Sequence, residues 1–469
     1  MAIAATTTTV THPAEGGFVE DGLAKLKLTL NANAQSSTNS DTESVATEPT
    51  LVDPYNYVGE TFGSGPGEDY PYPEFLPHNP PRTHSDPALP LYDITDRGHF
   101  ADPDHARLRA FVEARGGKIK DLGICVGTVI EGDVKLEDLG DAERDDLALL
   151  VAQRGVVFFR KQYTFSIEDQ RALGSHYGPL HVHPTYAVPR RGDLDDVVVV
   201  YSDKNSRPDL YAFSRAELFH SDVTYEVQPP GTTILKLLVT PEVGNDTLWS
   251  SGYALYSSLS KYFQTYLESL KALHSGFNQA ASRTAVTAIP RREPIETAHP
   301  VVRVHPVTGW KAIFVNAGFV TRLIGVPKAE NDAVLAFLKD SFAQQTGEWI
   351  RTRPARFKAD YSSDATCRWR RVDHYATERI RADLTRWEAG DVAIWDNRVV
   401  NHSATFDAYP SLRHGLRVTP TAEKPLSVAE YEAETGKEAK DWLQDRFERL
   451  GISGPKADDG KTKSKAFRD

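Results

Sequence analysis

Five short runs of β-branched and other apolar residues constrain the fold of this chain more than any other feature of its sequence. Each run is bounded by Pro, Gly, Asp or Asn, which is typical of β-strands. In the second half of the chain, helices do not alternate one-for-one with these runs, which disfavours a doubly wound parallel sheet. The pattern predicts an α+β fold in which a β-sandwich or barrel carries flanking helices. The predicted strands are residues 196–202, 232–240, 311–319, 391–399 and 414–421.

Four segments with helical periodicity accompany these strands. Ser166 followed by Asp169 is a capping pattern, in which the two side chains satisfy backbone N–H groups of the first turn. Acidic first turns and Gly stops mark other helix ends. We predict helices over residues 104–117, 141–155, 166–178 and 328–345, and a buried strand over 156–162. The absence of a regular sequence repeat disfavours propellers and solenoids.

Composition divides the chain into four parts. Residues 1–50 are rich in Thr, Ser, Asn and Ala and have too little apolar surface to offset chain entropy, so a disordered tail is expected. Residues 51–104 are dense in Pro, Gly and aromatic residues, which predicts an extended arm that docks on a domain. We expect one α+β domain over 105–452 and a flexible C-terminal tail over 453–469.

Charge and cysteine content exclude several classes of protein. The formal net charge of the 469 residues is −11, whereas a general nucleic-acid binder needs a basic face. Two cysteines are too few for a disulfide framework. No signal peptide and no apolar stretch of membrane-spanning length is found, so we expect a cytoplasmic protein that binds neither nucleic acid nor membrane. A homo-oligomer, either dimer or tetramer, stays open.

Known cofactor motifs are mostly missing from the sequence. The Gly-rich stretch 63–67 neither follows a strand nor opens a helix, so it does not predict a dinucleotide site. No Walker A motif, Gly-x-Ser-x-Gly elbow or His-Glu-x-x-His motif is present.

The stretch "FHSDVTYEV" at residues 219–227 contains a His-x-Asp pair, His220 and Asp222. If this stretch is a strand, the two side chains point to one face and Ser221 points away. Taken alone, such a pair belongs to a solvated loop more often than to a metal site. A non-haem Fe(II) site needs two imidazoles and one carboxylate, with open positions for co-substrate and oxygen.

A second histidine with a suitable setting lies near the end of the chain. His402 follows a hydrophobic strand, and the next predicted strand carries Arg413 and Arg417. A 2-oxo acid that completes an iron shell needs a cation for its distal carboxylate, and the planar fork of arginine suits that geometry. The combination of His-x-Asp, a distant histidine and following arginines therefore favours a metal site.

Longer stretches carry a resemblance to a known family. They are "GVVFFRKQ", "GPLHVHPTYAVP", "FHSDVTYEVQPPGTTIL", "GNDTLWSSGYALYSSLS", "HPVVRVHPVTGWKAIFVNAGFVTRL" and "DVAIWDNRVVNHSATFDAYPSLRHGLRVT". The chain resembles the taurine dioxygenase family of Fe(II)/2-oxoglutarate-dependent oxygenases, especially its fungal sulfonate dioxygenase branch. The resemblance extends over roughly residues 118–425.

The resemblance implies a double-stranded β-helix, or jelly roll, and a set of site residues. It implies that the iron ligands are His220, Asp222 and His402, and that Arg413 and Thr247 bind 2-oxoglutarate. The implied sulfonate contacts are His183, Arg417 and the backbone N–H of Val223, and the implied pocket walls are Tyr186, Trp249 and Phe319. Four of these residues have an ordinary alternative: Trp249 and Phe319 would serve equally as plain core residues, Tyr186 as an aromatic residue on the surface of a strand, and Arg417 as half of an ion pair.

The implied reaction uses Fe(II), 2-oxoglutarate as co-substrate and O2, with ascorbate as a supporting reductant. It hydroxylates the carbon next to sulfur of an alkyl sulfonate and releases sulfite and an aldehyde, with succinate and CO2 as co-products. The same chemistry on an alkyl sulfate, an aryloxy acid or an oxidised purine is the alternative. A non-catalytic jelly-roll binding module is a further alternative that the intact set of ligands disfavours.

Two departures from the bacterial enzymes bear on the substrate. Ala216 stands where they carry an Asn that contacts the taurine amine, which places taurine itself in doubt. The chain also has an Arg-rich insertion around 351–373. This insertion forms either a solvated loop, which charge runs favour, or a lid over the active site, a role open to the arm as well.

Overall fold

The computed structural model describes residues 69–205, 216–284, 289–344 and 387–451, with the short pieces 51–52, 66, 207–208 and 350–351. The predicted tails 1–50 and 453–469 lie outside the described residues, as do residues 352–373 of the predicted insertion. The mixture of helices and sheets agrees with the predicted α+β composition.

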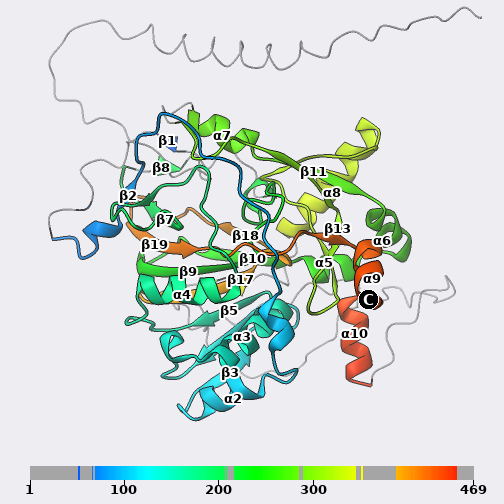
Figure 1. The fold of residues 1–469 in the computed structure, drawn as a ribbon, viewed down its shortest axis with the longest axis horizontal. Coiled ribbons are helices and arrows are strands. Elements are labelled where there is room, and N and C mark those ends of the chain that lie inside the picture. Colours follow the sequence, from blue (N-terminus) through cyan, green and yellow to red (C-terminus); the bar gives the residue numbers. More distant parts are fainter. Residues whose placement is uncertain are drawn as a thin grey trace, which may run out of the picture. The chain divides into compact units, whose positions relative to one another are not determined.

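A seven-stranded sheet, here called the main sheet, forms the centre of the fold (Figure 1). Its neighbouring strands pair antiparallel, except for one parallel pair, β4 with β5. Strands that are distant in sequence are neighbours in this sheet: β17, from the last part of the chain, lies between β5 and β9. In spatial order the strands are β3 (Lys118–Asp121), β4 (Thr128–Glu131), β5 (Val156–Phe159), β17 (Val392–Asp396), β9 (Thr232–Val239), β19 (Arg413–Val418) and β7 (Val197–Ser202).

Several small sheets complete the strand framework. The one that matters for the site has the order β16 (Ile350–Arg351), β10 (Thr247–Ser251), β18 (Val400–Ala404). Two further three-stranded sheets consist of β12 (Glu296–Pro300), β11 (Lys271–Ser275) and β15 (Val320–Leu323), and of β14 (Lys311–Ile313), β13 (Val302–Val304) and β20 (Leu426–Ser427). Two-stranded pairs join β1 (Leu51–Val52) to β8 (Arg207–Pro208) and β2 (Pro77–His78) to β6 (Val188–Pro189).

Helices cover one face of the main sheet and extend beyond it. Figure 1 shows α4 alongside β9 and α3 close to β5. The predicted cap is confirmed, because Ser166 and Asp169 form a reciprocal capping box at the start of α4. The helices are α2 (Ala106–Glu113), α3 (Asp141–Arg154), α4 (Ile167–Tyr177), α5 (Gly252–Ser258), α6 (Lys261–Glu268), α7 (Phe277–Thr284), α8 (Lys328–Gln344), α9 (Val428–Thr435) and α10 (Trp442–Arg449).

Strand alternation divides the core between the two faces of the main sheet. On β5, Val157 and Phe159 pack in the cluster that contains the buried residues of α3. Val156 and Phe158 point the other way and join a cluster with Trp249 and other aromatic residues. Because successive strand residues face opposite sides, the continuous apolar run of β5 is explained by burial on both faces.

The described part of the predicted arm packs against the main sheet. Residues 69–104 contain only short elements, among them η1 (Pro73–Phe75) and η2 (Arg97–Phe100). Tyr70 hydrogen-bonds His414 of β19 through its hydroxyl at 2.5 Å from Nδ1, and Leu76 is buried with Val199 and Leu416. The arm therefore contributes core residues to the outer side of β7 and β19.

One strand prediction is only partly right. Residues 311–319 were expected to form a single strand, but β14 ends at Ile313. The Asn316 side chain accepts a hydrogen bond from the backbone N–H of Phe319 at 2.9 Å, which turns the chain before β15 begins. A local side-chain bond to the backbone thus competes with the strand ladder.

Candidate active site

His220 reaches the site through a single β-bridge. It follows η4 (Ala216–Leu218) and pairs with His402 of β18 through two backbone hydrogen bonds, of 2.9 and 2.7 Å. The expected strand over 219–227 is wrong, because residues 222–225 form a turn. Ser221 nevertheless points away as expected, and its hydroxyl donates to the carbonyl of Val400.

The backbone pairing brings three candidate ligands together from two distant parts of the chain. Each of His220, Asp222 and His402 offers one ligand atom, and the three atoms lie within 4.8 Å of one another. The Nδ1 of His220 lies 3.0 Å from the carbonyl oxygen of Leu218, which fixes its proton there and presents Nε2 as the electron-pair donor. The three ligands that the sequence predicted therefore lie close together, although a turn and not a strand places Asp222.

Asp222 is ionised although it is buried. Its two carboxylate oxygens accept hydrogen bonds from Thr233 at 2.8 Å and from Arg417 at 2.7 Å. Burial opposes ionisation, but the charge of Arg417 and the neighbouring imidazoles outweigh it and lower the pKa of Asp222 to about 2. A carboxylate in this state is ready to bind a cation.

The two imidazoles are held neutral. Burial is the main cause that lowers the pKa of His402 well below its ordinary value, and it lowers the pKa of His220 as well. The Nδ1 of His402 is buried without a hydrogen-bond partner among the described residues. Two neutral imidazoles and one carboxylate in contact are a donor set that fits Fe(II).

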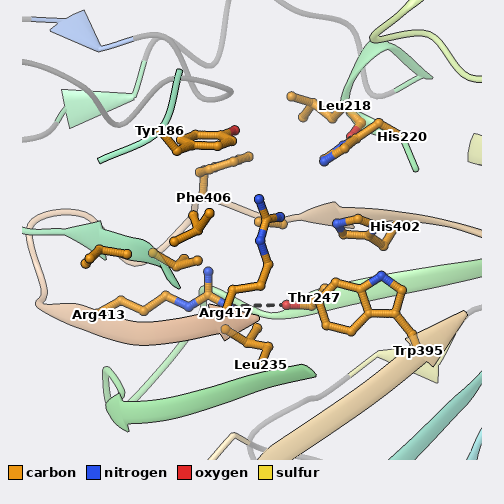
Figure 2. A pocket seen from close by; sticks show the side chains of 14 residues that line it. Tyr186, Leu218, His220, Leu235, Thr247, Trp395, His402, Phe406, Arg413 and Arg417 are labelled. Carbon is orange, nitrogen blue, oxygen red and sulfur yellow. Dashed lines mark hydrogen bonds between the residues drawn. The ribbon is translucent and has the colours of Figure 1, made fainter. Parts of the chain in front are cut away.

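Two arginines of β19 extend into a cavity beside these ligands (Figure 2). Arg413 and Arg417 are four residues apart on one strand, so they share a face of the main sheet. Arg413 donates a hydrogen bond to the hydroxyl of Thr247 on β10, at 3.2 Å. The cavity, of about 670 Å³ including its mouth, is therefore lined by two of the three candidate metal ligands, His220 and His402, and by two arginine cations.

The remaining walls of the cavity are mostly apolar and were not predicted. Strand alternation could have found several of them, because Val198, Val200, Leu235 and Trp395 project from main-sheet strands toward the arginines. Leu218 and Phe406 come from loops, where the sequence has no such periodic signal. The other unpredicted lining residues are Val199 and Ala404.

The predicted substrate residues divide into two groups. Tyr186 and Arg417 line the cavity, and the Arg417 guanidinium carbon lies 5.4 Å from the centre of the Tyr186 ring. His183, Val223 and Phe319 are buried next to the site but do not line this cavity. The His183 ring lies 4.2 Å from that of Tyr186, whereas Phe319 packs with Val223 in a small apolar cluster.

Trp249 occupies the core. It is fully buried among Phe158, Trp387 and Trp395, with ring centres 5.2 to 6.3 Å apart, and does not reach the cavity. On β10 its backbone pairs with His402, and its ring packs against that of Trp395, which lines the cavity in its place. The structure therefore supports the alternative prediction, that Trp249 is a core residue, and does not support a place for it in the pocket wall.

Comparison with known proteins decides the family. Residues 118–350 match the family model described as taurine catabolism dioxygenase TauD, TfdA family. A Schizosaccharomyces pombe protein assigned by name as an alpha-ketoglutarate-dependent sulfonate dioxygenase is 34% identical, over 76% of this chain and 82% of that protein. The chain belongs to the TauD/TfdA dioxygenase family.

A second relative and a solved structure agree with this placement. The alpha-ketoglutarate-dependent sulfonate dioxygenase of Saccharomyces cerevisiae is 33% identical, over 76% of this chain and 79% of that protein. A Burkholderia xenovorans structure, assigned by its title as an alpha-ketoglutarate-dependent taurine dioxygenase, is 24% identical with a TM-score of 0.51, and covers 67% of this chain and 96% of that one. This likeness identifies the fold as that of the dioxygenase family.

Among the described residues, no helix is both long and apolar enough to cross a membrane.

Proposed function

We propose that this TauD/TfdA dioxygenase uses Fe(II), 2-oxoglutarate and O2 to hydroxylate the carbon next to sulfur of an alkyl sulfonate, with release of sulfite and an aldehyde. We further propose that the strands around its cavity form a double-stranded β-helix. The observation that carries the proposal is the meeting of His220, Asp222 and His402, with ligand atoms within 4.8 Å, beside a cavity that contains Arg413. The two sulfonate dioxygenases of yeasts support the choice of substrate class.

The iron site requires little rearrangement of the protein. His220, Asp222 and His402 would supply three ligands and leave the remaining positions for co-substrate and oxygen. Iron loaded with 2-oxoglutarate and O2 supplies the oxidant for hydroxylation, and the co-substrate leaves as succinate and CO2. The protein holds both imidazoles neutral and Asp222 ionised, so no proton has to leave these ligands at neutral pH.

Arg413 and Thr247 form the proposed site for the far carboxylate of 2-oxoglutarate. Arg413 is buried and already oriented by its bond to the Thr247 hydroxyl, so little side-chain entropy is lost when the carboxylate binds. Burial strengthens the charge-assisted bonds because water does not compete for them.

Arg417 and the apolar walls form the proposed substrate site. In the described structure Arg417 binds Asp222 at 2.7 Å, and a cation that occupies the ligand set would take over that carboxylate. Arg417 would then be available for the substrate anion. Val198, Leu218 and Phe406 offer an apolar surface to the chain that carries the sulfonate.

One assay tests the proposal. The purified protein with Fe(II), ascorbate and 2-oxoglutarate is given a panel of C2–C6 alkylsulfonates, and succinate and sulfite are measured together. Sulfite formed in equal amounts with succinate supports the proposal. Sulfate released from alkyl sulfates, without sulfite from any sulfonate, would move the reaction to sulfate esters. Metal binding without any succinate would indicate a binding module.

A further inference from the structure

The turn that follows Asp222 is held from several sides by buried polar groups. Thr224 is fully buried, and its hydroxyl lies 2.8 Å from His274 Nδ1 and 3.0 Å from the amide nitrogen of Asn316. Val223 at the start of this turn has φ of 38°, in the left-handed region that a β-branched residue rarely adopts. Such a conformation persists only where the surroundings enforce it.

Glu226 is the charged member of this turn. Its carboxylate is buried, with 5% of the residue exposed, and it accepts hydrogen bonds from the Arg292 guanidinium and from His181 Nε2, the latter at 3.0 Å. Arg292 and His181 are equally buried. A buried carboxylate with two such partners costs more to disrupt than an exposed ion pair.

Arg291 and Arg292 bind a second segment at the same time. The Arg292 guanidinium donates to the carbonyl of Val182, and the Arg291 guanidinium donates to the carbonyl of His183. The backbone N–H of Arg291 donates to the carbonyl of Pro184 at 2.7 Å. The paired arginines therefore tie residues 181–184 to the turn that contains Val223 and Glu226.

His183 lies in the segment that the two arginines hold, and its Nε2 is oriented as a hydrogen-bond donor. Its Nδ1 accepts the backbone N–H groups of Thr185 and Tyr186, each at 3.1 Å, which places its proton on Nε2. That Nε2 is buried and has no hydrogen-bond partner among the described residues. A buried donor held in this way is poised for an acceptor that arrives from outside.

We propose that Glu226 and Arg292 are positioning residues that set the affinity for the substrate anion by holding His183 in register with the Val223 turn. The inference rests on the proposed function, together with the sulfonate contacts that the family resemblance implies for His183 and the backbone N–H of Val223. Neither Glu226 nor Arg292 contacts Arg413 or Thr247 in the described structure. The pair therefore acts on substrate binding and leaves 2-oxoglutarate binding unchanged.

The test compares two glutamate-to-glutamine changes. Glu226→Gln removes the charge that pairs with Arg292. Glu423→Gln is the control, because Glu423 likewise accepts hydrogen bonds from two basic side chains, Arg303 at 2.7 Å and Arg398 at 3.0 Å. Neither Glu423 nor the two arginines that it binds line the cavity. Arg292→Lys keeps the charge but loses the fork that reaches both Glu226 and Val182.

The readouts are Tm, the KM values for alkylsulfonate and 2-oxoglutarate, and equilibrium binding of pentanesulfonate to the protein loaded with Fe(II) and 2-oxoglutarate in the absence of O2. We expect Glu226→Gln to weaken pentanesulfonate binding and raise the alkylsulfonate KM by about tenfold or more, with the 2-oxoglutarate KM changed less than about twofold. Arg292→Lys is expected to lie between wild type and Glu226→Gln. Glu423→Gln should lower Tm without changing any KM.

The outcomes separate this inference from the proposed function. If wild type binds pentanesulfonate but turns over no sulfonate, the proposed reaction fails and the binding comparison still decides the role of Glu226. Equal pentanesulfonate binding by wild type and Glu226→Gln, with Tm lowered as in Glu423→Gln, would make the pair merely structural. A wild type that binds no sulfonate would overturn both proposals.

Discussion

Two buried polar clusters differ in how fully their groups are satisfied. The Asp396 cluster consists of Asp96, Asp396, Glu423, Arg303, His305 and Arg398. Within it, Arg398 alone makes bonds of 2.7 to 2.9 Å to Asp396 and reaches Asp96 and Glu423 at 2.5 and 3.0 Å. Among the described residues, Arg303 Nε is the one buried side-chain atom of this cluster without a hydrogen-bond partner, whereas the cavity cluster has His402 Nδ1 and Arg417 Nε in that state around a single carboxylate.

The difference separates a structural role from a functional one. In the Asp396 cluster each acidic side chain is paired with a basic one. These ion pairs connect the arm, β17 and β13, so the charges hold the three segments together. The cavity cluster has two arginines and two imidazoles around one carboxylate, an arrangement that leaves binding capacity for a metal ion and for anions. A buried polar group left open is costly unless a ligand completes it.

Asp222→Ala is expected to have the largest effect on activity and a smaller one on folding. Loss of the only carboxylate ligand should reduce 2-oxoglutarate turnover by about a thousandfold or more and lower Fe(II) binding. Succinate formation and metal content after dialysis measure both effects. Turnover near the wild-type rate would remove Asp222 from the ligand set.

Asp396→Asn should show the opposite profile. Because it leaves Arg398 and His305 with a weakened buried partner, we expect the free energy of unfolding to fall by about 3 kcal/mol or more. Denaturant unfolding measures this loss, and the folded variant should keep the 2-oxoglutarate KM of wild type. A variant that is as stable as wild type but inactive would reverse the roles assigned to the two clusters.

Arg413→Met tests whether the cavity arginine is held for an anion. We expect the KM for 2-oxoglutarate to rise by about a hundredfold, because a buried charge-assisted pair is lost. Thr247→Val removes only the single hydrogen bond that the hydroxyl accepts from Arg413 and should raise this KM by about fivefold. If Arg413→Met changed stability but not the KM, Arg413 would belong with the structural cluster.

Much of this site could be predicted from sequence, because its key residues stand in recognisable stretches. His220, Asp222, His402 and Arg413 lie in the stretches that carry the resemblance to the family, and Tyr186 and Thr247 also line the cavity. The fold prediction succeeded where long apolar runs form strands buried on both faces, as in β5 and β9. It failed over 219–227, where buried partners from distant segments hold a turn against an alternating pattern typical of strands.

Other features depend on contacts between segments far apart in the sequence. The sequence around Trp249 fits a pocket wall as well as a core position, and only its packing against Phe158, Trp387 and Trp395 in the folded chain places it in the core. The ion pair between Glu226 and Arg292 joins residues that are 66 positions apart, and no local sequence pattern predicts it. The same holds for Phe406, a loop residue whose place in the cavity wall depends on the course of its backbone.

The pH dependence of stability should single out the Asp396 cluster. Burial opposes ionisation of Asp396 and Asp96, but the Arg398 guanidinium outweighs it and lowers the pKa of both carboxyls. A lowered pKa in the folded state contributes stability that is complete above the ordinary aspartate pKa of about 4 and declines as pH falls below it. Wild type should therefore lose free energy of unfolding below about pH 4 more steeply than Asp396→Asn. Parallel curves would show that Asp396 has no part in the acid sensitivity.

The smallest expected effect concerns backbone strain in the cavity wall. Phe406 has φ of 52° and is buried beside the arginines, and Figure 2 shows it on the side of the cavity that Tyr186 also lines. Neither Asp396 nor Arg398 has positive φ, so the structural cluster carries no comparable strain. Phe406→Ala keeps the strain and removes the ring, whereas Phe406→Gly relieves the strain as well. Glycine should thus be the more stable variant by about 1 kcal/mol, the reverse of the order at an ordinary position.

Both variants should also enlarge the cavity by the volume of the lost ring. We expect them to shift the preferred alkylsulfonate toward longer chains, by about fourfold in kcat/KM for each added methylene that fills the space. Thermal unfolding and a chain-length series measure the two effects separately. If Phe406→Ala and Phe406→Gly differ in chain-length preference, the backbone conformation itself shapes the substrate site. If neither shifts it, the ring only completes the packing around Arg413, and the strain at Phe406 has no counterpart in substrate selection.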